Sequence, residues 1–205
     1  RRPEPRAERR PDRRPEPRDD RRGPTGNVPR AQGGVLIVTD ERSPRAANIV
    51  AQTLQSVAPF SCLDIAVAIH QVDAADFGCT GESPRQRVRG HDRIVLCGNS
   101  ANGKAQRYKR EAGARHVIIV TENSRVGGNG GSPPVVTDSI ILQGGPLAGI
   151  HELMHTFGFR DTYQEGNWVS EGDVMTCTGP NCYVLPGDYN RIARAFGKSL
   201  PSSCR

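Results

Sequence analysis

Two histidines, a glutamate and an aspartate are concentrated in one short stretch, HELMHTFGFRD, at residues 151–161. On a helix, His151 and His155 are four residues apart and project from the same face. Their imidazoles can therefore reach one ion at the ~2.0–2.1 Å that zinc requires. Glu152 lies about 100° further round such a helix, a poor position for a ligand but a suitable one for a general base that holds a water.

An open zinc site needs three protein ligands and a water, so the chain must supply one more ligand after this helix. Gly158 allows a sharp turn there, and Asp161 follows three residues later. Glu165 and Glu171 are competing candidates in the next segment. We favour Asp161. The alternative interpretation is an ordinary surface helix with exposed polar residues, but a chance match to this spacing is rare.

The stretch resembles HExxHxxGxxD, the aspartate version of the metzincin zinc-peptidase signature. Metzincins also carry a methionine in a tight turn beneath the metal, and GDVMTC (172–177) places Met175 after Asp161 at a suitable distance. The chain is most similar to the snapalysin type, small secreted bacterial neutral proteases with an aspartate as third ligand. The resemblance covers about residues 146–196. Residues 32–145 match only in the general order of elements.

The resemblance implies a zinc endopeptidase. In such an enzyme zinc activates a water and polarises the scissile carbonyl, Glu152 passes the water's proton to the leaving amine, and Met175 supports the site from below. A tyrosine could assist the oxyanion. Tyr163 and Tyr183 are candidates, although ordinary packing explains either of them equally well.

The segments before the motif predict a mixed sheet with helices packed on it, because strand, helix and strand alternate at the start of the chain. Apolar runs rich in β-branched residues predict strands at 35–40, 62–70, 93–98, 116–121 and 135–143. We assign the chain to the α+β class, as a metzincin-like zincin with a mixed twisted sheet, an active-site helix and a C-terminal helical subdomain. A substrate peptide would lie extended along a strand above the metal, either 116–121 or 135–142.

Helices are predicted by three- and four-residue apolar spacing. The expected helices begin at Pro44, span 101–112, begin at Pro146 and span 188–196. The third of these carries the motif, with one apolar face formed by Leu147, Ile150, Met154 and Phe157. Gly158 and Gly197 are the expected stops of the last two helices.

The basic charge of the chain is concentrated in its first thirty residues, which hold eleven arginines and six acids, whereas the whole chain has a net charge of +6. This proline-rich repeat lacks large apolar residues, so we predict a disordered tail at 1–31 and a metallopeptidase domain at 32–205. The tail is either a solvated linker or an arm for anionic surfaces. Its interleaved acids favour the linker.

Six cysteines without a CxxC pair predict three disulfides in an oxidising compartment, and only Cys177–Cys182 can be paired by inspection. The alternative is buried free thiols. No apolar run approaches the ~20 residues of a membrane span. We therefore expect a secreted monomer that acts on protein or peptide substrates.

Several weaker signals are not assigned to the site. His70, His91 and His116 have no carboxylate at ligand spacing, so they are expected to be structural or exposed. Segment 122–131 offers oxygen ligands for Ca²⁺ but lacks regular acidic spacing, so zinc is the expected cofactor and calcium a secondary one. Trp168 could line the substrate cleft or simply pack under its loop.

Two other functions fit the same residues. One is a narrowly targeted protease, a toxin or effector that cuts a single host protein. The other is a catalytically silent binding module of the same fold, anchored by its basic tail. An intact Glu152 argues against the silent module, because a zinc-stabilised binding domain does not need the base.

Overall fold

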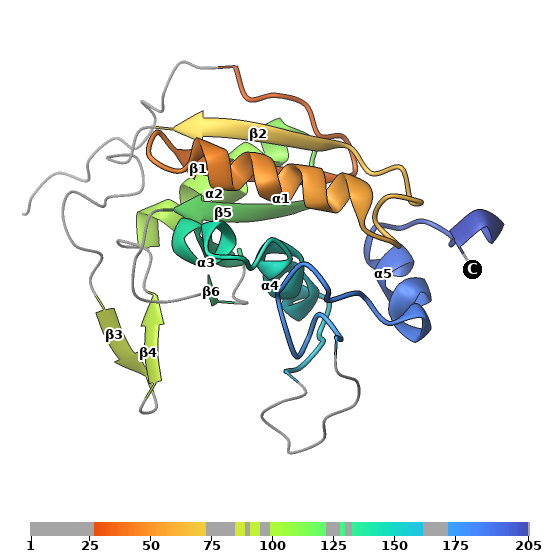
Figure 1. Cartoon of the computed structure of the whole chain (residues 1–205). Coiled ribbons are helices and arrows are strands. Elements are labelled where there is room, and N and C mark those ends of the chain that lie inside the picture. The colour runs from red at the N-terminus through yellow and green to blue at the C-terminus, as the bar shows by residue number, and fades with distance from the viewer. Residues whose placement is uncertain are drawn as a thin grey trace, which may run out of the picture.

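The centre of the protein is a five-stranded mixed sheet with the strand order β2-β1-β5-β7-β6 (Figure 1). The computed structural model describes residues 27–72, 85–88, 91–94, 99–121, 128–129, 133–161 and 172–204. The sheet strands are β1 (Val35–Asp40), β2 (Val67–Val72), β5 (His116–Thr121), β6 (Gly128–Asn129) and β7 (Val135–Thr137). Four of them run parallel, and β6 pairs antiparallel with β7 at one edge. β3 (Arg85–Val88) and β4 (His91–Ile94) form a separate antiparallel pair.

Helices cover both faces of the sheet, which confirms the predicted mixed α+β class. The helices are α1 (Pro44–Ser56), α2 (Asn99–Glu111), α3 (Asp138–Leu142), α4 (Ala148–Thr156) and α5 (Tyr189–Ala195), with single 3₁₀ turns at Pro186–Asp188 and Ser202–Cys204. Alternate residues of β1 point into two separate cores. Val35 and Ile37 belong to a core that also holds residues of α1, α4 and α5, whereas Leu36 and Val38 belong to a second core with residues of α2. This double burial explains why β1 is apolar almost throughout.

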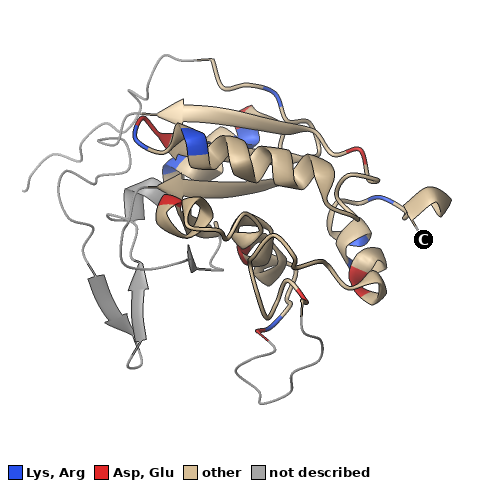
Figure 2. Ribbon diagram, viewed as in Figure 1, with Lys and Arg blue, Asp and Glu red and all other residues tan. Residues whose placement is uncertain are grey.

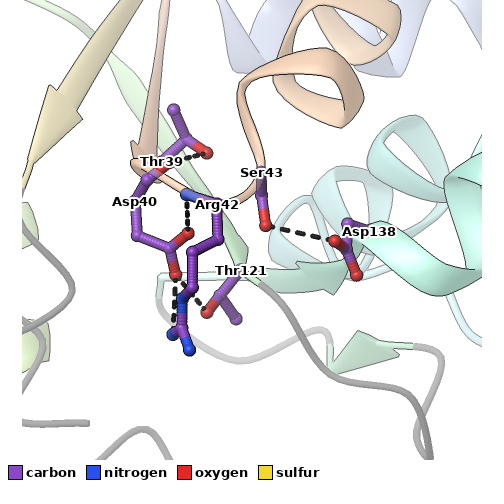
Figure 3. A network of polar contacts seen from close by, with 6 residues as sticks. All are labelled: Thr39, Asp40, Arg42, Ser43, Thr121 and Asp138. Carbon is purple, nitrogen blue, oxygen red and sulfur yellow. Dashed lines mark hydrogen bonds and ion pairs between the residues drawn. The ribbon is translucent and has the colours of Figure 1, made fainter. Parts of the chain in front are cut away.

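Charged residues are nearly absent from the central strands. β2 and β5 carry no Lys, Arg, Asp or Glu, and β1 carries one such residue, at its last position (Figure 2). That residue, Asp40, lies at the carboxyl end of the parallel strands, where its Oδ2 accepts a 3.0 Å hydrogen bond from Thr121 Oγ1 of β5. Its Oδ1 accepts from the backbone N–H of Arg42 at 2.9 Å. The fully buried carboxylate therefore links the ends of β1 and β5 (Figure 3).

Most predicted elements are confirmed, with shifted ends. β1 and β5 have the predicted bounds, and α2 begins two residues before the predicted start. β2 begins at Val67, not at Cys62, because Leu63 donates back to Pro59 in a turn and Asp64 adopts a left-handed φ of 46°. β4 overlaps only the start of the predicted strand at 93–98, and the rest of that strand lies outside the described residues.

The strand predicted at 135–143 is wrong after Thr137, because residues 138–142 form α3. Thr137 occupies the N-cap position, and Asp138 in the first turn stabilises the positive end of the helix dipole. Ser43 Oγ, just before α1, lies 3.3 Å from the carboxylate Oδ2 of Asp138 and ties the two helix starts together (Figure 3). The apolar pair Ile140-Ile141 therefore packs from a helix.

The helix that carries the motif is present and is set against α1. It begins at Ala148, two residues after Pro146, and Leu147, Ile150 and Met154 are buried as predicted. An added Cβ at Gly149 would lie 2.7 Å from Val50 Cγ1, so the close approach of α1 and α4 requires glycine. The last helix also agrees with its prediction, since Ile192 and Phe196 are buried and Gly197 follows at a φ of 66°.

Two disulfides occur among the described residues. Cys177–Cys182 is the predicted local pair, and Cys62–Cys204 joins the turn after α1 to the C-terminal end, 142 residues away. Cys79 and Cys97 lie outside the described residues. None of the described helices is long and apolar enough to cross a membrane.

The folded body begins before the predicted boundary at residue 31. Ala31 is fully buried, and its N–H donates to Ala112 O at 2.9 Å. Residues 1–26, which form most of the predicted tail, lie outside the described residues.

His116 of β5 contacts phenylalanines that follow α4 and α5. Its ring packs on Phe157 and Phe196, with centroid distances of 4.9 and 4.8 Å, and its Nε2 lies 3.2 Å from Ala195 O. Burial lowers the pKa of His116 to about 4. The Ala195 carbonyl opposes this shift, and the charges of Lys109 and Arg115 add to it.

We therefore predict that His116 makes the fold acid-sensitive. Below pH 6.5 the unfolded chain binds a proton at His116 that the folded protein does not bind until about pH 4. The free energy of unfolding therefore falls between these values, by about 2 kcal/mol after a discount for solvent screening. His116→Phe should remove this part of the loss in urea unfolding at pH 7 and 4.5. An unchanged difference between the two pH values would contradict the assignment.

Candidate metal centre

Helix α4 brings the two histidines of the motif together. His151 Nε2 and His155 Nε2 lie 3.2 Å apart, and their rings are nearly perpendicular. This contact follows from the four-residue spacing on a helix. His151 is 8% exposed and His155 is partly buried, so the pair lies at the border between core and solvent.

Asp161 returns to both rings from beyond the end of α4. The chain leaves the helix through Gly158, whose φ of 83° is in the left-handed region. Asp161 Oδ1 then lies 3.2 Å from each Nε2 atom. The three atoms form a triangle with equal sides. A tetrahedral zinc with ~2.0–2.1 Å bonds would separate its ligand atoms by about 3.3–3.4 Å, so this donor set fits such an ion.

Backbone carbonyls fix the orientation of both imidazoles. His151 Nδ1 lies 2.8 Å from Val174 O, and His155 Nδ1 lies 3.0 Å from Phe159 O. Because a carbonyl can only accept, each Nδ1 carries the hydrogen. In the neutral rings both Nε2 atoms therefore present lone pairs toward each other and toward a carboxylate. Three acceptors at this spacing need a cation between them, whether a metal ion or bound protons.

The pKa shifts of the two histidines and of Asp161 also favour positive charge at this site. The hydrogen bond with Asp161 raises the pKa of His155 despite its burial. Burial lowers the pKa of His151, but the bonds with Asp161 and with the Val174 carbonyl outweigh it and the net shift is upward. For Asp161, burial is outweighed by the two histidines, which hold its pKa far below the usual range. The group therefore consists of an ionised carboxylate and two imidazoles that attract a cation.

Glu152 is next to the first histidine and is also buried, with 8% of its surface exposed. Burial raises the pKa of Glu152 to about 7, while His151 and His155 oppose the shift and Asp161 adds to it. Among the described residues, the cluster with metal-binding spacing consists of the two histidines and Asp161, without Glu152. The role of Glu152 as a general base therefore stays a prediction.

Met175 lies in a turn directly after the residue that orients His151. Its side chain is 2% exposed, and its N–H donates to Asp173 Oδ1 at 3.2 Å. Two backbone bonds hold this turn to the next segment, from Val174 N to Tyr183 O at 2.8 Å and from Tyr183 N to Gly172 O at 2.7 Å. The Cys177–Cys182 disulfide closes the loop between them.

The other predicted residues have contacts of their own or lie outside the described part of the chain. Tyr183 is 44% exposed and its ring lies against Gly172. His70 is buried against Tyr108 on the opposite face of the sheet, as expected of a structural histidine. Outside the described residues lie Tyr163, Glu165, Trp168 and Glu171. Of the possible calcium segment, only the backbone of β6 is described, and β4 begins at His91.

Sequence reasoning missed the carbonyls of Val174 and Phe159. Every residue has a carbonyl, so no residue type could have marked them. The only available signal was the general rule that a ligating histidine donates its second nitrogen to an acceptor.

No protein-family model, curated protein or solved structure matches this chain. The assignment of the site therefore depends on its residues and their geometry.

The third ligand can be tested directly. We expect Asp161→Ala to weaken zinc binding by about 100-fold or more, because it removes one of three ligands and the negative charge of the cluster. Glu165→Ala and Glu171→Ala are matched controls and should keep the affinity of the parent. Competition with a chromophoric chelator measures all four proteins. Loss of zinc in Glu171→Ala but not in Asp161→Ala would identify a different third ligand.

Proposed function

We propose that the chain is a secreted zinc-dependent endopeptidase of the metzincin type. Three acceptor atoms spaced 3.2 Å apart, two of them oriented by backbone carbonyls, carry this proposal. They match the donor set of an open zinc site, with three protein ligands and room for a water. The two disulfides are compatible with an oxidising compartment outside the cell.

Each residue of the motif then has a separate task. His151, His155 and Asp161 would hold the ion. When bound, zinc supplies Lewis-acid chemistry, in that it acidifies a water and polarises a carbonyl. Glu152 accepts a proton from the attacking water and delivers it to the amine nitrogen as the C–N bond breaks. Burial raises the pKa of Glu152 in the metal-free protein to about 7, and a cation bound beside it would lower this pKa, so Glu152 would be ionised and able to accept the proton.

The substrate is best accommodated along β6. Neither strand predicted for this role has a free edge, because β5 lies between β1 and β7, and β7 lies between β5 and β6. That earlier expectation is therefore wrong. β6 is the last strand in the order of the sheet, and it contacts α4 and the separate strand β4. We propose that an extended peptide adds to this edge through backbone hydrogen bonds.

The burial of Glu152 favours an enzyme over a silent binding module. A buried carboxylic acid with a raised pKa costs stability, and such groups concentrate at catalytic sites. A binding module would gain nothing from that cost.

The general base can be tested by a change that leaves the zinc ligands intact. Glu152→Gln keeps the size of the side chain but cannot accept the proton, so we expect casein hydrolysis to fall by about 100-fold or more while zinc stays bound. Measurements use the zinc-loaded parent and variant at equal metal content. Equal cleavage by both would refute the role of Glu152. If the parent holds zinc but leaves casein intact, a narrow-substrate protease or a binding role replaces the broad one.

A further inference from the structure

The turn between the second histidine and Asp161 determines whether the third ligand reaches the site. Its amides are bonded back into α4, from Gly158 N to His155 O at 2.9 Å and from Phe159 N to Met154 O at 3.3 Å. Its carbonyls accept hydrogen bonds from side chains. Phe159 O accepts from His155 Nδ1, so the direction of this carbonyl sets the direction of a ligand ring.

Arg191 of α5 holds the same turn from outside. Its Nη2 and Nε donate to Phe157 O at 2.8 and 3.2 Å. Its guanidinium carbon lies 4.1 Å from the centroid of the Phe159 ring. One side chain thus contacts the residues on both sides of Gly158, through two hydrogen bonds and a cation–π contact.

Gly158 itself allows this approach. A Cβ at that position would lie 2.7 Å from Arg191 Nη2. The glycine therefore serves both the left-handed turn and the close contact with the guanidinium. A lysine at 191 would keep the charge but would lack the planar group that bonds and stacks at the same time.

We propose that Arg191 is a positioning residue for the metal ligands, and this inference rests on the proposed zinc site. By fixing the Phe157 carbonyl and the Phe159 ring, Arg191 fixes the Phe159 carbonyl that orients His155. It also fixes the path of the chain to Asp161, two residues further on. Without Arg191, the Phe159 carbonyl that orients His155 and the segment that leads to Asp161 are no longer held by one side chain.

A purely structural role for Arg191 makes a different prediction. Arg191 is exposed, and substitutions of exposed residues usually change stability little. If Arg191 only fastened α5 to α4, its loss would lower the melting temperature of the metal-free protein and leave metal affinity unchanged. A positioning role predicts lower metal affinity with little change in the melting temperature of the metal-free protein.

The experiment compares the full chain with Arg191→Ala, Arg191→Lys and the matched control Arg194→Ala, an exposed arginine on the same helix. We expect zinc affinity to fall about 10- to 100-fold in both Arg191 variants and to stay unchanged in the control. The visible spectrum of the Co²⁺ form should also change in both, because the ligand geometry is altered. The melting temperature of the metal-free protein should shift by no more than a few degrees.

A second variant keeps the test valid if Arg191→Ala folds poorly. Phe159→Leu removes the ring beneath the guanidinium but keeps the backbone carbonyl, and it should reduce zinc affinity in the same direction. Parental affinity and Co²⁺ spectrum in Arg191→Ala, or full recovery in Arg191→Lys, would overturn the inference alone. A parent chain that binds no zinc would overturn the proposed site and this inference with it.

Discussion

The structure of the site depends on one electrostatic constraint. Two imidazole lone pairs and a carboxylate oxygen meet 3.2 Å apart, and both imidazoles have already given their N–H groups to backbone carbonyls. Such an arrangement is repulsive unless positive charge lies between the atoms. Packing of a helix on the sheet alone does not require these three polar groups to lie together. The cluster therefore favours positive charge between these atoms, either a metal ion or bound protons.

The rest of the fold supplies rigidity around that cluster. α4 is held against α1 through Gly149 and buries its apolar face in the core beside the sheet. The Val174 carbonyl is held by the backbone pairing with Tyr183. Arg191 of α5 donates to the Phe157 carbonyl and lies over the Phe159 ring, close to the carbonyl that His155 contacts. The turn at Val174 thus orients His151, and α5 contacts the turn whose Phe159 carbonyl orients His155.

The parts of the fold and site that could be predicted from sequence are those with local causes. Helical spacing placed both histidines on one face, Gly158 indicated the turn, and continuous apolar runs identified β1 and β5. α3 was missed because Ile140-Ile141 suits a strand or a helix, and the apolar pattern did not show that a helix begins after Thr137 with Asp138 in its first turn. The two orienting carbonyls, the contacts of Arg191 and the position of β6 in the sheet arise from tertiary pairing, which no local pattern encodes.

The central claim is that this cluster is a zinc site with two imidazole ligands and one carboxylate. X-ray absorption at the zinc edge, on the full chain loaded with one equivalent of zinc, tests it most directly. The account predicts a shell of nitrogen and oxygen at about 2.0–2.1 Å with the scattering pattern of two imidazoles. Zinc that is bound through sulfur at about 2.3 Å, or that retains only water, would contradict it.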